Sequence, residues 1–190
     1  MTLSPPSIKI EQHRKSRLEL LEDASTDESL RASMASADVV LLPSTHEGKP
    51  LFPSDTVEIF RDLQAALPEA RVEIAVRDED YQERLLHSIL IDLGSILVKY
   101  VLIPVIPNVL WDLVKKRTGI LTDSKTRVCL LIAPQNDDDP IVSIEYEGSS
   151  EDFHKLFGTE TLDRLKIHFK LPPGETQRTE TAAEDEPRDS

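Results

Sequence analysis

The chain has 190 residues, a formal net charge of −13 and a single cysteine. Its length and its 39% hydrophobic content suit one ordinary domain. The negative charge disfavours binding to nucleic acid, and one cysteine excludes an intramolecular disulfide framework or an all-cysteine zinc site. The N-terminal residues show no apolar run typical of a secretory signal, so we expect a cytoplasmic protein.

Both ends of the chain are predicted to be flexible. Residues 1–36 are mostly polar, with one helical or extended candidate between Ile8 and Leu21. Residues 172–190 carry six acidic side chains, two arginines and no large apolar side chain, which is typical of a disordered tail. The sequence therefore predicts a flexible N-terminal extension, a single domain over residues 37–171 and a disordered acidic tail.

The first half of this domain combines strand and helix patterns. Residues 37–43 form a short apolar run typical of a central strand. Ser54 is the predicted N-cap of an amphipathic helix that ends at Pro68. Residues 71–77 alternate between apolar and polar side chains, which predicts a strand with one exposed face.

The most unusual segment covers residues 88–111, which are strongly apolar and carry only two charged side chains. From Tyr81 to Tyr100 the apolar side chains recur at helical spacing, so a long helix is predicted. Pro104 and Pro107 should break this helix, because each lacks an amide donor. A second helix follows over residues 108–117, and the segment is therefore predicted to form an apolar helical hairpin.

The last elements are a predicted β-hairpin and a short helix. Residues 127–133 read as an inner strand, and residues 140–147 as a half-exposed strand after a polar turn. Ser149 or Ser150 caps the short helix, and residues 162–171 fit either a helix or a strand. The fold class is α/β, with α+β as the alternative: one small sheet of about four strands packed with about three or four helices, including the apolar hairpin.

Residues 88–111 can be buried in the domain, covered by a partner protein or placed in a membrane. Insertion into a bilayer is near break-even, because about −4 to −8 kcal/mol from the aliphatic side chains offsets about +5 to +7 kcal/mol from two charges. Asp92 and Lys99 lie seven residues apart and would share one face of a helix. We therefore predict an interaction surface that includes Asp92, Lys99, Tyr100 and Trp111.

Catalytic and cofactor motifs are weak throughout the chain. No glycine-rich nucleotide loop, GxSxG elbow or HExxH pair occurs. His46 and Glu47 follow the first predicted strand of the domain and are candidates for a base and its partner, while Cys129 is predicted to be a buried, inert thiol. Residues 136–139 lack the spacing of a calcium-binding loop. No catalytic residue, metal ligand or cofactor is assigned.

The order of elements over residues 38–157 resembles the effector-associated constant component domains of bacterial conflict systems. The resemblance rests on VLWDLVKKR at residues 109–117 and on IEYEG at residues 144–148. It implies a noncatalytic adaptor in bacterial defence that couples effector proteins to signalling or protease partners. It carries over no active site.

Three functions are kept open at this point. The leading expectation is a noncatalytic adaptor or regulatory module that assembles with itself or with an effector protein through residues 88–111, as a homo-oligomer or a hetero-complex. The alternative is a membrane-associated protein in which these residues form a spanning or interfacial segment. The third is a small hydrolase of unknown substrate that uses His46 and Glu47, or Cys129.

Overall fold

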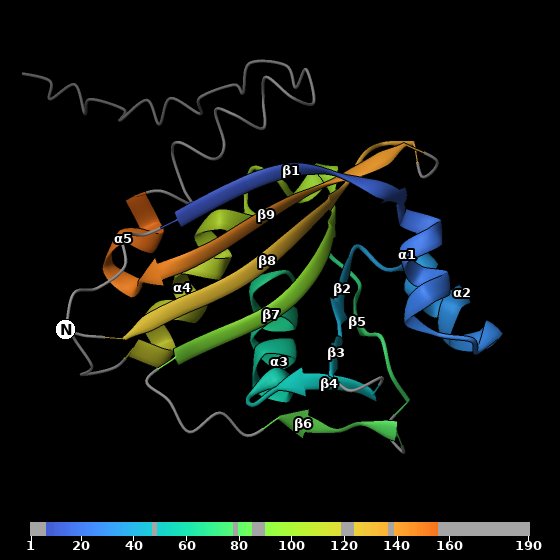
Figure 1. The fold of residues 1–190 in the computed structure, drawn as a ribbon, viewed down its shortest axis with the longest axis horizontal. Helices are drawn as coiled ribbons and strands as arrows, with labels where there is room; N and C mark the ends of the chain where they lie inside the picture. The colour runs from blue at the N-terminus through green and yellow to red at the C-terminus, as the bar shows by residue number, and fades with distance from the viewer. Residues whose placement is uncertain are drawn as a thin grey trace, which may run out of the picture.

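The computed structural model describes residues 7–46, 49–77, 80–84, 90–118, 124–136 and 139–155. These residues form a mixed α/β fold around one six-stranded sheet, with a second sheet of three short strands. In Figure 1, α3 and α4 lie behind the large sheet, and α1 and α2 lie beside its β2 and β5 end. The α/β class is confirmed, and the main sheet has more strands than the sequence predicts.

The large sheet combines parallel and antiparallel pairs. β9 lies between β1 and β8 and is antiparallel to both, while β7 is parallel to β8. On the other side of β7, β2 is antiparallel to β7 and parallel to β5. The strands in spatial order are β1 (Ser7–Ser16), β9 (Pro140–Ser149), β8 (Lys125–Ala133), β7 (Leu90–Lys99), β2 (Val39–Leu42) and β5 (Val72–Ile74). The small sheet contains β3 (Ser44–His46), β4 (Lys49–Pro53) and β6 (Glu83–Arg84).

Local capping explains where three of the helices begin. Ser16 and Glu19 form a reciprocal capping box at the first helix. The Asp27 carboxylate accepts from the Leu30 amide at the second, and Ser149 caps the last. The helices are α1 (Arg17–Ala24), α2 (Glu28–Ser36), α3 (Thr56–Ala66), α4 (Ile106–Thr118) and α5 (Ser150–His154), with a short 3-10 helix at Tyr100–Leu102.

The two faces of the sheet are buried against different helices. Ile96 and Val98 of β7 pack into the larger core cluster, together with side chains from α3, α4 and α5. Leu97, between them, points to the opposite side and joins a smaller cluster with Leu21 of α1 and Met34 of α2. Because β7 is covered on both faces, its apolar residues do not alternate with polar ones.

The predicted apolar helical hairpin is wrong in its first arm. Residues 83–84 and 90–99 form the strands β6 and β7, residues 85–89 lie outside the described residues, and only α4 is helical as expected. Within β7 the helical spacing arises from a bulge, since β7 gains one extra residue relative to β8 between Asp92 and Ser95. The bulge places Leu93 and Ile96 in the same core cluster, although residues three apart on a regular strand face opposite sides.

The predicted flexible N-terminal extension also differs from the structure. From Ser7 onward it forms β1, α1 and α2, and β1 pairs with β9 from Ser7 to Gln12 in regular register. The segment from Ile8 to Leu21 was expected to be either extended or helical, and it contains both. The partner strand lies 130 to 140 residues away in the chain over this stretch, so local patterns do not reveal the pairing.

The other predicted elements agree with the structure within a few residues. β2, α3, β5 and α4 lie where the sequence places a strand, a helix, a strand and a helix. β8 and β9 form the expected antiparallel pair, and Ser149 caps the short helix α5. The acidic tail, residues 162–171 and the predicted domain end at residue 171 lie outside the described residues.

Candidate functional site

The C-terminal end of β7 is fixed to the start of β2 by one carboxylate. Lys99 Nζ donates to Asp38 Oδ1 at 2.9 Å, and the Lys99 amide donates to the Asp38 carbonyl at 2.9 Å. The Arg71 amide donates to Asp38 Oδ2 at 3.0 Å. The chain therefore leaves the sheet after Lys99 from a well-anchored position.

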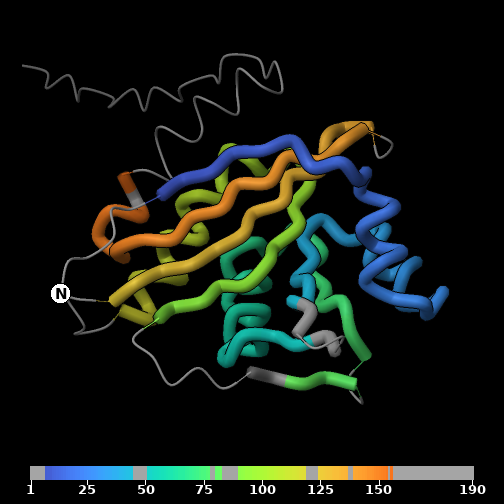
Figure 2. The backbone as a smooth tube through the Cα atoms, in the orientation of Figure 1, coloured from blue at the N-terminus to red at the C-terminus, as the bar shows by residue number. Residues whose placement is uncertain are grey.

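A compact turn follows this anchor and leads into α4. Within it, the Ile103 amide donates to the Tyr100 carbonyl at 3.1 Å, and the Val105 amide to the Leu102 carbonyl at 3.0 Å. The Ile103 and Ile106 side chains are buried in the larger core cluster, with exposed fractions of 1% and 0%. Figure 2 follows the chain from β7 through this turn to α4, behind the sheet.

The outer side of this turn is apolar and faces solvent. Val101 has an exposed fraction of 60% and Val105 of 44%, and Pro104 between them is also exposed. We call Val101, Pro104 and Val105 the apolar turn. Half-buried Val109 continues this surface, because it lies one helical turn beyond Val105 and its amide donates to the Val105 carbonyl at 3.2 Å.

The four residues predicted as an interaction surface do not form one patch. Asp92 and Lys99 lie near opposite ends of β7, about 20 Å apart from the rise of an extended strand. Asp92 Oδ1 accepts from the Gly94 amide at 3.0 Å within the bulge. Tyr100 begins the 3-10 helix and is half-buried against the core, so only Lys99 and Tyr100 lie beside the apolar turn.

Trp111, the fourth predicted residue, lies on a different part of α4. Its ring is half-buried against the core, and Lys115 Nζ lies 5.7 Å from its centroid. This distance allows a cation–π interaction. The predicted residues do not include exposed Val101 and Val105, for which the sequence offers only a pair of prolines that interrupt an apolar run.

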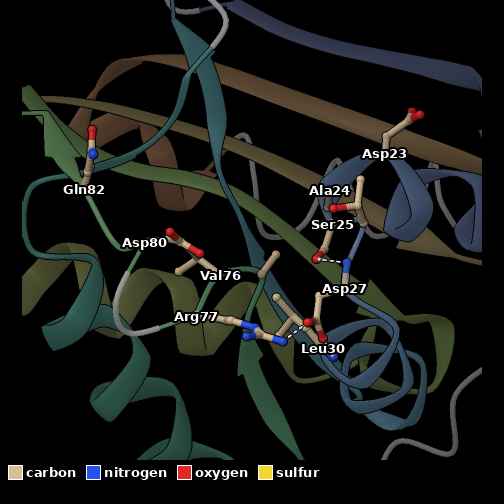
Figure 3. Close-up of a pocket in the computed structure, with 11 residues that line it drawn as sticks. Asp23, Ala24, Ser25, Asp27, Leu30, Val76, Arg77, Asp80 and Gln82 are labelled. Atoms are coloured by element: carbon tan, nitrogen blue, oxygen red, sulfur yellow. Dashed lines mark hydrogen bonds and ion pairs between the residues drawn. The ribbon is translucent and has the colours of Figure 1, made fainter.

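A cavity of about 640 Å³ lies at the loop between α1 and α2. In Figure 3 Arg77 and Asp27 point toward one another across it, and they form an ion pair. Ser25 Oγ accepts from the Asp27 amide at 3.1 Å. Asp23, Ala24, Ser25, Thr26, Asp27, Leu30, Ala75, Val76, Arg77, Asp80 and Gln82 line the cavity.

Asp27 and Arg77, two of the polar groups that line this cavity, have structural roles. Asp27 caps α2 and also pairs with Arg77. Within the described residues, no group of three or more histidine, cysteine, aspartate or glutamate side chains is arranged to hold a metal ion. Asp27 and Arg77 therefore hold two walls of the cavity together.

Neither hydrolase candidate is assembled into a catalytic pair by the described residues. Glu47 and the side chain of His46 lie outside them, and the backbone of His46 ends β3. Burial raises the pKa of the Cys129 thiol to about 11, with the nearby Glu145 adding to this effect. A thiol with such a pKa is protonated at neutral pH and is a weak nucleophile.

Residues 90–111 are divided between a strand, a 3-10 helix and the first part of α4. No helix among the described residues has the length and apolar character required to cross a bilayer. Comparison with known proteins finds no matching family model, no similar curated protein and no similar solved structure.

Proposed function

We propose that the protein is a noncatalytic binding module that docks a partner protein on the apolar turn. The exposure of Val101 and Val105 carries this proposal, because both side chains point outward from a turn that Ile103 and Ile106 anchor in the core. An anchored apolar surface loses little conformational entropy on binding. Contiguous exposed apolar side chains, in contrast to isolated ones, mark candidate sites of protein contact.

The surroundings of the apolar turn define the chemistry of the partner. The next exposed residues along α4 are Asn108 and Asp112, and the exposed Lys115 and Lys116 follow in its last turn. The partner should therefore offer an apolar side chain to the turn, with polar groups around it, as in an interface with a small apolar centre. The resemblance to effector-associated constant component domains supports the same class of function, the recruitment of another protein.

Site-specific photo-crosslinking tests this proposal directly. A photoreactive residue at position 101 should crosslink one specific protein in cells, whereas the same residue at exposed Lys125 should not. Lys125 is a suitable control because it begins β8, at the sheet end opposite Lys99 and the apolar turn. The crosslinked protein is then purified, and its affinity for the wild-type chain is measured by calorimetry.

Two charge substitutions complete this experiment. Val101→Glu and Val105→Glu should each weaken binding at least about tenfold, since about 1.4 kcal/mol of apolar burial is lost. Lys125→Glu should leave the affinity unchanged. Equal binding by all variants would contradict the proposal. Crosslinking of position 101 to lipid, together with vesicle binding that Val101→Glu abolishes, would also contradict it, because the turn would then be a membrane contact.

A further inference from the structure

β1 forms one edge of the six-stranded sheet, at the top of Figure 1. It pairs with β9 on one side, and no strand of the described residues pairs with its other side. Its register with β9 is regular from Ser7 to Gln12. The outer backbone amides and carbonyls of such an edge are available to another strand.

The charges on this edge are self-complementary. Lys9 and Glu11 are exposed, lie on the same face of β1 and flank Ile10, and their side chains form a 2.8 Å ion pair. If two copies of β1 run antiparallel with Ile10 opposite Ile10, Lys9 of each copy lies opposite Glu11 of the other. Opposite charges placed directly across two strands stabilise the pair.

The same charges disfavour the neighbouring registers. The nearest antiparallel registers that keep the same faces of the two strands together are centred on residue 9 or on residue 11. The first places Lys9 opposite Lys9, and the second places Glu11 opposite Glu11. Like charges directly across two strands destabilise the pair. Charged side chains often protect edge strands from pairing, but here the order of the two signs selects one arrangement of two identical strands.

The other face of β1 fits this arrangement too. Ile8 and Ile10 are half-buried against the larger core cluster, so part of each side chain is still exposed at the edge. In the Ile10-centred register the two Ile10 side chains meet, and Ile8 lies opposite Gln12 of the other copy. Pairing therefore covers apolar surface beside the helices and joins charges on the opposite face.

We propose that a second copy of this chain pairs with β1, antiparallel and centred on Ile10, and joins two six-stranded sheets into one. This contact is separate from the apolar turn and does not depend on the proposed binding of a partner protein. The interface consists mainly of backbone hydrogen bonds, two Lys9–Glu11 pairs and one Ile10–Ile10 contact, so we expect a dimer that dissociates on dilution.

Sedimentation velocity over a concentration series tests the proposal with two single variants. Lys9→Glu and Glu11→Lys each place like charges opposite one another in a homodimer, so each variant alone should sediment as a monomer. An equal mixture should form a heterodimer, because every opposing pair is then complementary. Neither variant retains the ion pair within one chain, so recovery on mixing can arise only from contacts between chains.

Disulfide trapping gives an independent measure of the register. In a Cys129→Ser background, which removes the native cysteine, Lys9→Cys mixed with Glu11→Cys should crosslink faster than either variant alone. Lys125→Glu and Val101→Glu should both leave the dimer intact. Circular dichroism confirms that each variant is folded.

The proposal is overturned if the wild-type chain stays monomeric at every concentration tested. It is equally overturned if the two charge variants dimerise alone as well as they do when mixed, or if mixing restores nothing. Loss of the dimer with Val101→Glu would place self-association on the apolar turn instead.

Discussion

Lys99, the last residue of β7, donates a 2.9 Å hydrogen bond to the carboxylate of Asp38, which directly precedes β2. The second oxygen of Asp38 accepts from the Arg71 amide, just before β5. One side chain therefore joins three strands at the end of the sheet from which the apolar turn projects. The position of the turn depends on this carboxylate as well as on its buried isoleucines.

The ionisation of Asp38 should make stability depend on pH. Its partial burial favours a higher pKa, but the hydrogen bonds from Arg71 and Lys99 outweigh this and lower the pKa of Asp38. A carboxyl whose pKa is lower in the folded state stabilises the protein above its unfolded pKa, and this contribution is lost as the pH falls through the folded value. Asp38→Asn should therefore be less stable than wild type at pH 7. The difference in unfolding free energy between the two proteins should be smaller at about pH 3.

Urea denaturation at both pH values measures this difference. Asp62, whose pKa is also lowered, is present in both proteins and therefore cancels in the comparison. A difference between Asp38→Asn and wild type that is the same at pH 7 and pH 3 would show that the Asp38 charge does not contribute.

Arg17 should be among the most important buried polar side chains. Its guanidinium is buried, and Nη2 donates to the carbonyls of Met34 at 3.2 Å, Ala35 at 3.0 Å and Ala37 at 2.8 Å. These carbonyls end α2 and lead into β2, and Arg17→Met would remove their shared donor. Arg17→Met should lower the unfolding free energy by about 3 kcal/mol, whereas exposed Arg14→Met should change it by less than about 0.5 kcal/mol. Urea denaturation of both variants at pH 7 checks this, and equal effects would contradict it.

Gly94 should be intolerant of any side chain. Its φ is +70°, and an added Cβ would lie 3.0 Å from Cγ and 3.3 Å from Cδ of Pro53. Gly94→Ala should therefore cost about 1–3 kcal/mol, from the left-handed conformation and the close contact together. In a Pro53→Ala background the cost should be smaller, because the contact atoms are gone. A thermal denaturation cycle of the four proteins separates the two causes, and identical costs in both backgrounds would rule out the contact.

Local patterns were sufficient to predict several elements. The apolar stripe of α3, the basic last turn of α4 and the alternation of β9 are each complete within one segment, as is the Ser149 cap of α5. Such signals depend on side chains a few residues apart, which a sequence displays directly. The hairpin of β8 and β9 is predictable for the same reason.

The remaining features depend on residues far apart in the chain. β7 is apolar on both faces because strands and helices from the whole chain cover it, and its bulge at Gly94 imitates helical spacing. The sequence shows no partner for Lys99, because Asp38, to which it donates a hydrogen bond, lies 61 residues away in the chain. Likewise, nothing in the apolar run distinguishes exposed Val101 from buried Ile103.

Cys129 should react slowly in the folded protein. With its thiol pKa raised to about 11 from 9.0, mainly by burial, its thiolate fraction at pH 8 should be about a hundredfold lower than in the unfolded chain. Alkylation by iodoacetamide, followed by mass spectrometry, should therefore be about a hundredfold slower in buffer than in urea. Rapid alkylation of the folded protein at pH 8 would instead support Cys129 as a nucleophile.

Substitutions at Val101 and Ile103, which lie two residues apart, should differ strongly in their effect on stability. Ile103 is buried, so Ile103→Ala should lower the unfolding free energy by about 2–5 kcal/mol through lost burial and a cavity. Val101 projects into solvent, so Val101→Ala should change it by less than about 0.5 kcal/mol. Urea denaturation of both variants measures this contrast. A large loss for Val101→Ala would mean that this side chain packs within the protein, and the apolar turn would then have no free surface to offer a partner.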